Sequence, residues 1–133
     1  MTTPPNPPSG DSAFKSRGGL RRIFNAARYS LAGFRAAFRH EAAFRQELVL
    51  GIPMLLLVPF VAPGRWQALL LAGSVVAVWI VELLNSAVEA LADTISTEHH
   101  PMLGRAKDIG SAAVMLALVF AGVVWTVILW PAK

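Results

Sequence analysis

Long stretches without any charged residue constrain the fold of this chain more than any other feature. The clearest stretch runs from Ile109 to Trp130, and its 22 residues can cross a hydrocarbon core of about 30 Å at about 1.5 Å per residue as a helix. Hydrophobic residues make up 55% of the 133 residues and charged residues only 15%, which is too apolar for an ordinary soluble domain of this size. The sequence therefore predicts a small integral membrane protein.

Two further stretches predict additional membrane spans. Residues 66–81 are also uncharged, and the helical pattern of apolar residues continues to 92. Residues 41–62 form a shorter candidate that contains Pro53 and Pro59. Prolines remove backbone donors and tend to kink a helix, but neighbouring helices can absorb such kinks inside a membrane. We expect an all-α membrane protein with spans at about 41–62, 66–92 and 109–130.

The segment before the first span predicts a helix at the membrane surface. Apolar residues that recur every three or four positions would cover one side of a helix over residues 20–40: Leu20, Ile23, Phe24, Ala27, Leu31, Phe34 and Phe38. Arg21, Arg28 and Arg35 follow the edge of that side, where they can reach lipid phosphates. A simple membrane anchor is an equally good interpretation of this helix. Residues 1–19, with a proline-rich start, are expected to form a disordered cytoplasmic tail.

The basic residues predict the orientation of the spans. Ten of the twelve Lys and Arg residues lie before Leu48, where the uncharged part of the first span begins, or between the second and third spans, and only Arg65 and Lys133 lie on the other side. Because basic residues near span ends stay in the cytoplasm, the N-terminus is expected there. The net charge of +4 could suggest nucleic-acid binding, but these charges flank hydrophobic helices and fit anionic membrane lipids better. We therefore expect no nucleic-acid partner.

Acidic residues interrupt the second span. Seven of the eight acidic residues lie between Glu41 and Asp108. Glu82, Asn85, Glu89 and Asp93 fall within an arc of about 80° on one helix face. Charges near a bilayer cost roughly 2.5 to 3.5 kcal/mol each, and neighbouring carboxylates resist joint ionisation unless cations balance them. Magnesium that carries a nucleotide triphosphate meets this need, although polar stripes also join helices in oligomers.

Other sequence signals narrow the chemistry. Lys107, directly before the third span, could neutralise a phosphate near the carboxylates, or it could be an ordinary flanking charge. The adjacent His99 and His100 lack a third ligand at zinc-like spacing. The absence of cysteine excludes disulfides and cysteine nucleophiles. No Gly-rich phosphate loop, hydrolase elbow or soluble-kinase signature is present, so phosphoryl chemistry would need another architecture.

Three ordered motifs resemble one known family. They are Glu41-Ala-Ala-Phe-Arg-Gln-Glu47, Glu82-Leu-Leu-Asn-Ser-Ala-Val-Glu89 followed by Asp93, and the segment Gly104-Arg-Ala-Lys-Asp-Ile-Gly-Ser-Ala-Ala113. Together they resemble the prokaryotic integral-membrane diacylglycerol kinases, over about residues 20–130. The resemblance implies a three-span homotrimer in the bacterial inner membrane that transfers the γ-phosphate of MgATP to a lipid hydroxyl. Residues 20–133 would then form the membrane kinase domain.

The resemblance also implies roles for matching residues. Glu82 would be the catalytic base that takes the proton of the lipid hydroxyl, and Glu41 and Glu89 would bind the Mg²⁺ that accompanies ATP. Asn85 and Asp93 would support that cluster. The residues expected around ATP are Arg22, Tyr29, Glu41, Glu89, Glu98, His100, Lys107 and Asp108. The residues expected around the lipid substrate are Arg22, Glu47, Glu82 and Ser111. Arg45 and Gln46 have no clear role in this scheme.

The position of Glu82 agrees with the role of a base. Glu82 lies deeper in the predicted span than Glu89 and Asp93, and is therefore closest to the hydroxyl of a lipid. Phosphoryl transfer depends mainly on positioning and on stabilising spread negative charge, for which two carboxylates with Mg²⁺ and one lysine suffice.

Several alternatives stay open. Relatives that share these motifs phosphorylate undecaprenol, whose hydroxyl also lies beneath the interface, and sequence does not separate this acceptor from diacylglycerol. We favour diacylglycerol because the surface helix and the first motif resemble the Gram-negative type. A small cation or proton transporter could use the same carboxylates, and a purely structural membrane anchor would not depend on them.

Overall fold

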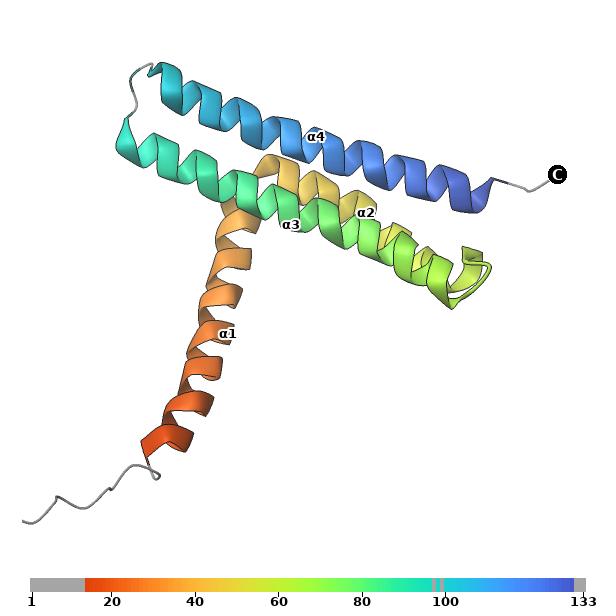
Figure 1. Cartoon of the computed structure of the whole chain (residues 1–133), viewed down its shortest axis with the longest axis horizontal. Coiled ribbons are helices and arrows are strands. Elements are labelled where there is room, and N and C mark those ends of the chain that lie inside the picture. The colour runs from red at the N-terminus through yellow and green to blue at the C-terminus, as the bar shows by residue number, and fades with distance from the viewer. Residues whose placement is uncertain (1–13, 97, 99, 131–133) are drawn as a thin grey trace, which may run out of the picture. The chain divides into compact units, whose positions relative to one another are not determined.

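A computed structural model describes residues 14–96, 98 and 100–130 of the chain, and four α-helices make up the regular structure of these residues (Figure 1). They are α1 (Phe14–His40), α2 (Ala42–Val61), α3 (Arg65–Ile95) and α4 (Pro101–Leu129). The predicted all-α fold with three long apolar helices is confirmed. Residues 1–13 of the predicted tail and His99 lie outside the described residues, and the chain is already helical from Phe14, before the predicted start at residue 20.

The chain divides into two compact units, of which the first ends at Ala36. Within this unit, the apolar residues of α1 lie exposed, including Leu20, Ile23 and Phe24. The apolar side of this amphipathic helix lies exposed because the described part of the unit contains no second helix that could cover it.

Residues 37–130 hold the last turn of α1 and the three long helices. Figure 1 shows α3 running alongside α4, and α3 also packs against α2, so α3 is the element that both neighbours share. Residues 62–64 join α2 to α3, which places these two helices antiparallel. Pro101 opens α4 at a position where the missing backbone donor costs nothing.

Burial in this unit differs from that in a soluble protein, because many large apolar side chains lie exposed while one carboxylate is buried. Phe60 is 85% exposed and Val49 is 71% exposed, whereas Glu82 is only 3% exposed. Lipid tails solvate apolar side chains but not charges, so the apolar residues can face the bilayer while the polar ones pack between helices. The three helices are long and apolar enough to cross a membrane. The chain is a multi-pass membrane protein.

The structure adds one detail to the expectation drawn from sequence and differs from it in another. Both Pro53 and Pro59 lie inside α2, which nevertheless continues unbroken to Val61, and both prolines are exposed. The third apolar helix begins at Pro101 and not near Ile109, so Lys107 and Asp108 are helical residues. The geometry of α4 therefore sets the directions in which their side chains leave the backbone.

Candidate active site

The buried face of α3 carries the first part of the candidate site. Glu82 and Ser86, one turn apart, are buried, while Asn85 and Glu89 are half-buried. These residues share a face because positions three, four and seven apart align on a helix. Leu84 and Leu91, elsewhere on the helix surface, are exposed. The local sequence of α3 thus directs Glu82 and Glu89 toward the other helices and Leu84 and Leu91 away from them.

Helix α2 adds two more carboxylates to this face. Glu41 and Glu89 lie close enough to Glu82 for their charges to act on its carboxylate, and the charge of Glu82 acts in turn on Glu47. Glu41 sits at the N-terminus of α2, where its side chain makes no capping hydrogen bond within the described chain. The Oε2 atom of Glu47 is buried and has no hydrogen-bond partner among the described residues. Glu41 at the N-terminus of α2, Glu47 of α2, and Glu82 and Glu89 of α3 thus interact through their charges and are here called the carboxylate cluster.

Asn85 links the carboxylate cluster to α4. Its Nδ2 donates a hydrogen bond of 3.0 Å to Oε1 of Glu89. Its Oδ1 is buried without a partner among the described residues and lies against Gly110 of α4. A side chain at position 110 would occupy the space that Asn85 fills. Gly110 is therefore the residue that allows α4 to approach Asn85 so closely.

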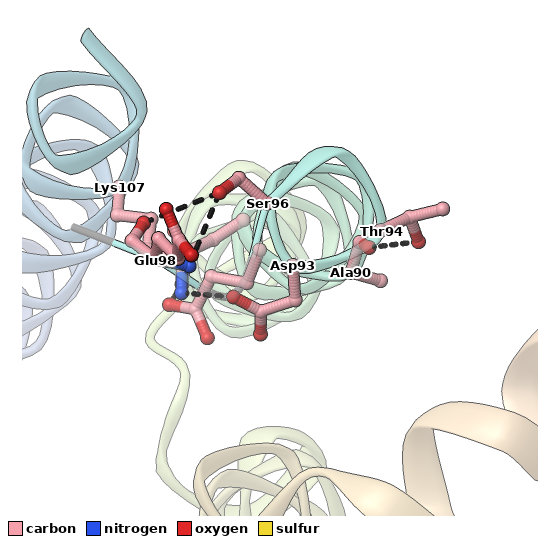
Figure 2. Close-up of polar contacts among 8 residues, drawn as sticks. Ala90, Asp93, Thr94, Ser96, Glu98 and Lys107 are labelled. Atoms are coloured by element: carbon pink, nitrogen blue, oxygen red, sulfur yellow. Dashed lines mark hydrogen bonds and ion pairs between the residues drawn. The ribbon is translucent and has the colours of Figure 1, made fainter. Parts of the chain in front are cut away.

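A second polar group lies at the end of α3 and the start of α4. Lys107 of α4 forms an ion pair with Asp93 of α3, with Nζ 2.5 Å from Oδ1 (Figure 2). The charge of Glu89 also acts on Lys107. The backbone N–H of Glu98 donates a hydrogen bond of 3.1 Å to Oγ of Ser96 in the connection between the helices. The ion pair with Asp93 holds the lysine at the edge of the carboxylate cluster.

These residues surround an open pocket of about 290 Å³. Its lining includes Asp93, Ser96, Glu98, His100 and Lys107. Its polar groups include one ammonium group, a histidine and the carboxylates of Asp93 and Glu98, a set that suits a polar ligand better than an apolar one. The structure thus brings together Glu98, His100 and Lys107, which the sequence assigned to ATP.

Other predicted site residues lie apart from both groups. Asp108 and Ser111 are exposed on α4, and the contacts found in the described chain do not join them to the carboxylates. Arg22 and Tyr29 belong to the first compact unit, where both are exposed and the Arg28 guanidinium lies 5.5 Å from the centre of the Tyr29 ring.

The donor set fits a magnesium ion that arrives with a nucleotide. Among the described residues, no group of three or more His, Asp or Glu side chains could hold a metal by itself. Glu41 and Glu89 are only half-buried and offer carboxylate oxygens, the ligand type that Mg²⁺ prefers. Because Mg²⁺ commonly takes the rest of its ligands from phosphates and water, one or two carboxylates are enough.

Sequence reasoning gave no role to several residues that build this site. Nη1 of Arg45 donates hydrogen bonds to the carbonyls of Phe38 and Arg39, at 3.1 and 3.2 Å, and so satisfies the end of α1. Trp79 and Gly51 join α2 to α3. A usable signal was the position of Trp79 in the interior of a span, because tryptophans of membrane proteins are enriched at span ends.

Replacing Gly110 with alanine is expected to impair the site. The new methyl group would collide with Oδ1 of Asn85 and lie 3.2 Å from its Cγ, so the amide must move away from Glu89. Overpacking of this kind costs about 1 to 3 kcal/mol. We expect a shorter half-life of thermal inactivation in detergent and a fall in activity of about tenfold.

Gly122→Ala is the matched control, because nothing lies within 4 Å of a Cβ built at that position of the same helix. Equal effects of the two substitutions would contradict the role given to Gly110.

Comparison with known proteins agrees with this architecture. The fold and site define a class: multi-pass membrane proteins that hold a cluster of carboxylates between their helices. The family described as prokaryotic diacylglycerol kinase matches residues 28–129. The protein named diacylglycerol kinase in Pseudomonas aeruginosa is 48% identical over 118 residues, which is 89% of this chain and 96% of the relative. The chain belongs to the prokaryotic diacylglycerol kinase family.

Relatives in other bacteria extend this result. The diacylglycerol kinase of Escherichia coli K12 is 46% identical over 84% of this chain and 92% of its own length, and that of Haemophilus influenzae is 45% identical over 84% and 95%. The family predicted from the three motifs is confirmed, and with it the class of lipid kinase. These relatives do not favour the alternatives of an undecaprenol kinase or a transporter.

Proposed function

We propose that this protein transfers the γ-phosphate of ATP to the hydroxyl of diacylglycerol and so forms phosphatidic acid. The observation that carries the proposal is the burial of Glu82, which is 3% exposed, among the carboxylates of Glu41, Glu47 and Glu89. Such a cluster persists in an apolar setting only where cations balance it. Magnesium with a triphosphate supplies them, which suits the kinase class of the family.

Each part of the site has a task in this reaction. Glu82 accepts the proton of the lipid hydroxyl as the oxygen attacks the γ-phosphorus, and the bond from that phosphorus to the bridging oxygen of ADP breaks. Glu41 and Glu89 would hold Mg²⁺, which neutralises charge on the phosphates when bound. Lys107 gives up part of its contact with Asp93 when ATP binds. Its ammonium group then pairs with the phosphate chain.

The remaining predicted residues complete the substrate sites. Glu98, His100 and Asp108 would adjoin the nucleotide, and Glu47 and Ser111 the lipid. Arg22 and Tyr29 would contact the substrates from α1. This helix would lie along the membrane surface with its exposed apolar side toward lipid. These assignments rest on the motifs and on the pocket beside Lys107.

The proposed setting is the bacterial inner membrane, with the N-terminus and the connection between α3 and α4 in the cytoplasm. The excess of Lys and Arg on that side supports this orientation. We also propose a homotrimer. Much of α4 lies exposed in the single chain, including Leu116 and Val127, and is available to neighbouring subunits or to lipid. Sedimentation of the detergent-solubilised protein would measure the number of subunits.

A parallel acceptor assay tests the proposed function. Purified protein in mixed micelles receives radiolabelled ATP and Mg²⁺ with diacylglycerol, undecaprenol or another lipid alcohol, and lipid products are separated. We expect labelled phosphatidic acid, and loss of product when EDTA removes Mg²⁺. Preferential labelling of undecaprenol would reassign the acceptor. Ion flux into liposomes without ATP, and no labelled lipid, would contradict the proposal.

A further inference from the structure

Two tryptophan side chains join neighbouring helices through the same kind of bond. Nε1 of Trp79 on α3 donates to the carbonyl of Glu47 on α2 at 3.2 Å. Nε1 of Trp125 on α4 donates to the carbonyl of Leu71 on α3 at 3.3 Å. Both bonds are partly buried and join residues far apart in the sequence. They differ in place, because only the first ends on a residue of the carboxylate cluster.

Gly51 makes the first bond possible. A Cβ at this position would lie 2.7 Å from Cζ2 of Trp79 and 2.8 Å from Cγ1 of Val75, which is closer than side-chain atoms approach. Gly51 is buried and lies one helical turn beyond Glu47 on α2. The indole therefore rests on the bare backbone of α2, and its N–H reaches the carbonyl one turn earlier.

The same bond lies next to the proposed reaction centre. Trp79 precedes Glu82 by three residues and so lies on nearly the same face of α3. The bond ties the turn of α3 that leads into Glu82 to the residue of α2 that carries the Glu47 carboxylate. The Oε2 atom of that carboxylate is buried and unpartnered among the described residues. Its position is thus set by the packing of α2 on α3 and not by a hydrogen bond to that oxygen.

We propose that Trp79, seated on Gly51, is a positioning residue for the lipid substrate. It fixes the axial position and the rotation of α2 relative to α3, and so determines the position of Glu47 relative to the base Glu82. This inference rests on the proposed function, since it assigns Trp79 to the presentation of the acceptor hydroxyl. Misplacement of a reacting group by about 1 Å can lower a rate by a factor of about a hundred. Loss of a bond that holds the two helices in register is therefore expected to slow the reaction.

Steady-state kinetics of Trp79→Phe test the proposal. Phenylalanine keeps an aromatic ring on Gly51 but lacks the N–H donor. We expect kcat/KM for diacylglycerol to fall by about threefold to tenfold, the range for loss of one interhelical hydrogen bond in a membrane. The KM for MgATP should stay within about twofold, because the pocket beside Lys107 lies between α3 and α4.

Trp125→Phe is the matched control, because it removes the same type of bond at nearly the same length. Both variants are expected to lose similar thermal stability, but only Trp79→Phe should alter the lipid kinetics. Gly51→Ala provides a second approach: it keeps the indole N–H but lifts the ring, and should cause the same lipid-specific defect.

The outcomes are separable. If both tryptophan variants showed the same kinetics, or if Trp79→Phe changed the constants for MgATP and lipid alike, the positioning role would be overturned while the proposed function stood. If the unaltered protein phosphorylated no lipid, the proposed function would be overturned, and this inference with it.

Discussion

Replacement of Glu82 with glutamine is expected to lower phosphotransfer to diacylglycerol by about a hundredfold to ten-thousandfold, the range that general-base catalysis supplies. Glutamine has nearly the same shape as glutamate but cannot accept the proton of the lipid hydroxyl. Glu82 is 3% exposed, so the substitution also removes one acid from the buried part of the carboxylate cluster. We therefore expect the variant to fold and assemble at least as well as the unaltered protein.

The combination of lower activity with retained stability is the informative result. Activity is measured with saturating MgATP and lipid, and assembly and thermal inactivation are followed in the same detergent. Ser74→Ala serves as the control, because Ser74 is buried on α3 as Glu82 is, and among the described residues its hydroxyl bonds to the carbonyl of Leu71 alone. This control should retain activity within about twofold. Near-normal turnover in Glu82→Gln would remove Glu82 from the role of base.

The second large effect is expected for Glu89→Gln. The Oε1 atom of glutamine can still accept the hydrogen bond of 3.0 Å from Asn85, so the local geometry persists while the charge is lost. A magnesium ligand that loses its charge binds the cation more weakly. We expect maximal activity to fall by about tenfold to a hundredfold, and half-maximal activity to require more Mg²⁺.

A magnesium titration at constant free ATP measures this change. Glu89→Asp keeps the charge on a shorter side chain and should recover part of the magnesium response. A titration curve that is unchanged in Glu89→Gln would argue against metal binding at this position. Because glutamine keeps the hydrogen bond to Asn85, a loss of activity with an unchanged magnesium midpoint would assign the charge of Glu89 a role other than magnesium binding.

The helices could be predicted from sequence because their signals are local. Apolar stretches and periodicity indicated α2, α3 and α4, and their observed ends lie within a few residues of the prediction except at the start of α4. That start was missed because the polar residues between Pro101 and Asp108 resemble a loop in composition, although a proline at the first position suits a helix. The bounds of α1 were affected similarly, since the residues before Leu20 carry no apolar periodicity.

The candidate site was only partly predictable. The stripe of Glu82, Asn85 and Glu89 followed from helical periodicity alone. The approach of Glu47 to Glu82, and of Gly110 to Asn85, depends on the packing of separate helices. No spacing within one helix contains that information. The family resemblance supplied roles for these residues but did not indicate which backbone groups hold them in place.

The sequence by itself determined that this protein spans a membrane several times, which family it belongs to and which acids one helix presents together, because hydropathy, motifs and periodicity are properties of neighbouring residues. Only the tertiary structure decided how α2 stands against α3. The bond from Trp79 to Glu47 joins residues 32 positions apart, and it requires a buried glycine on the opposite helix. Helix packing inside a membrane depends on such close complementary contacts, which become visible only when both helices are in place.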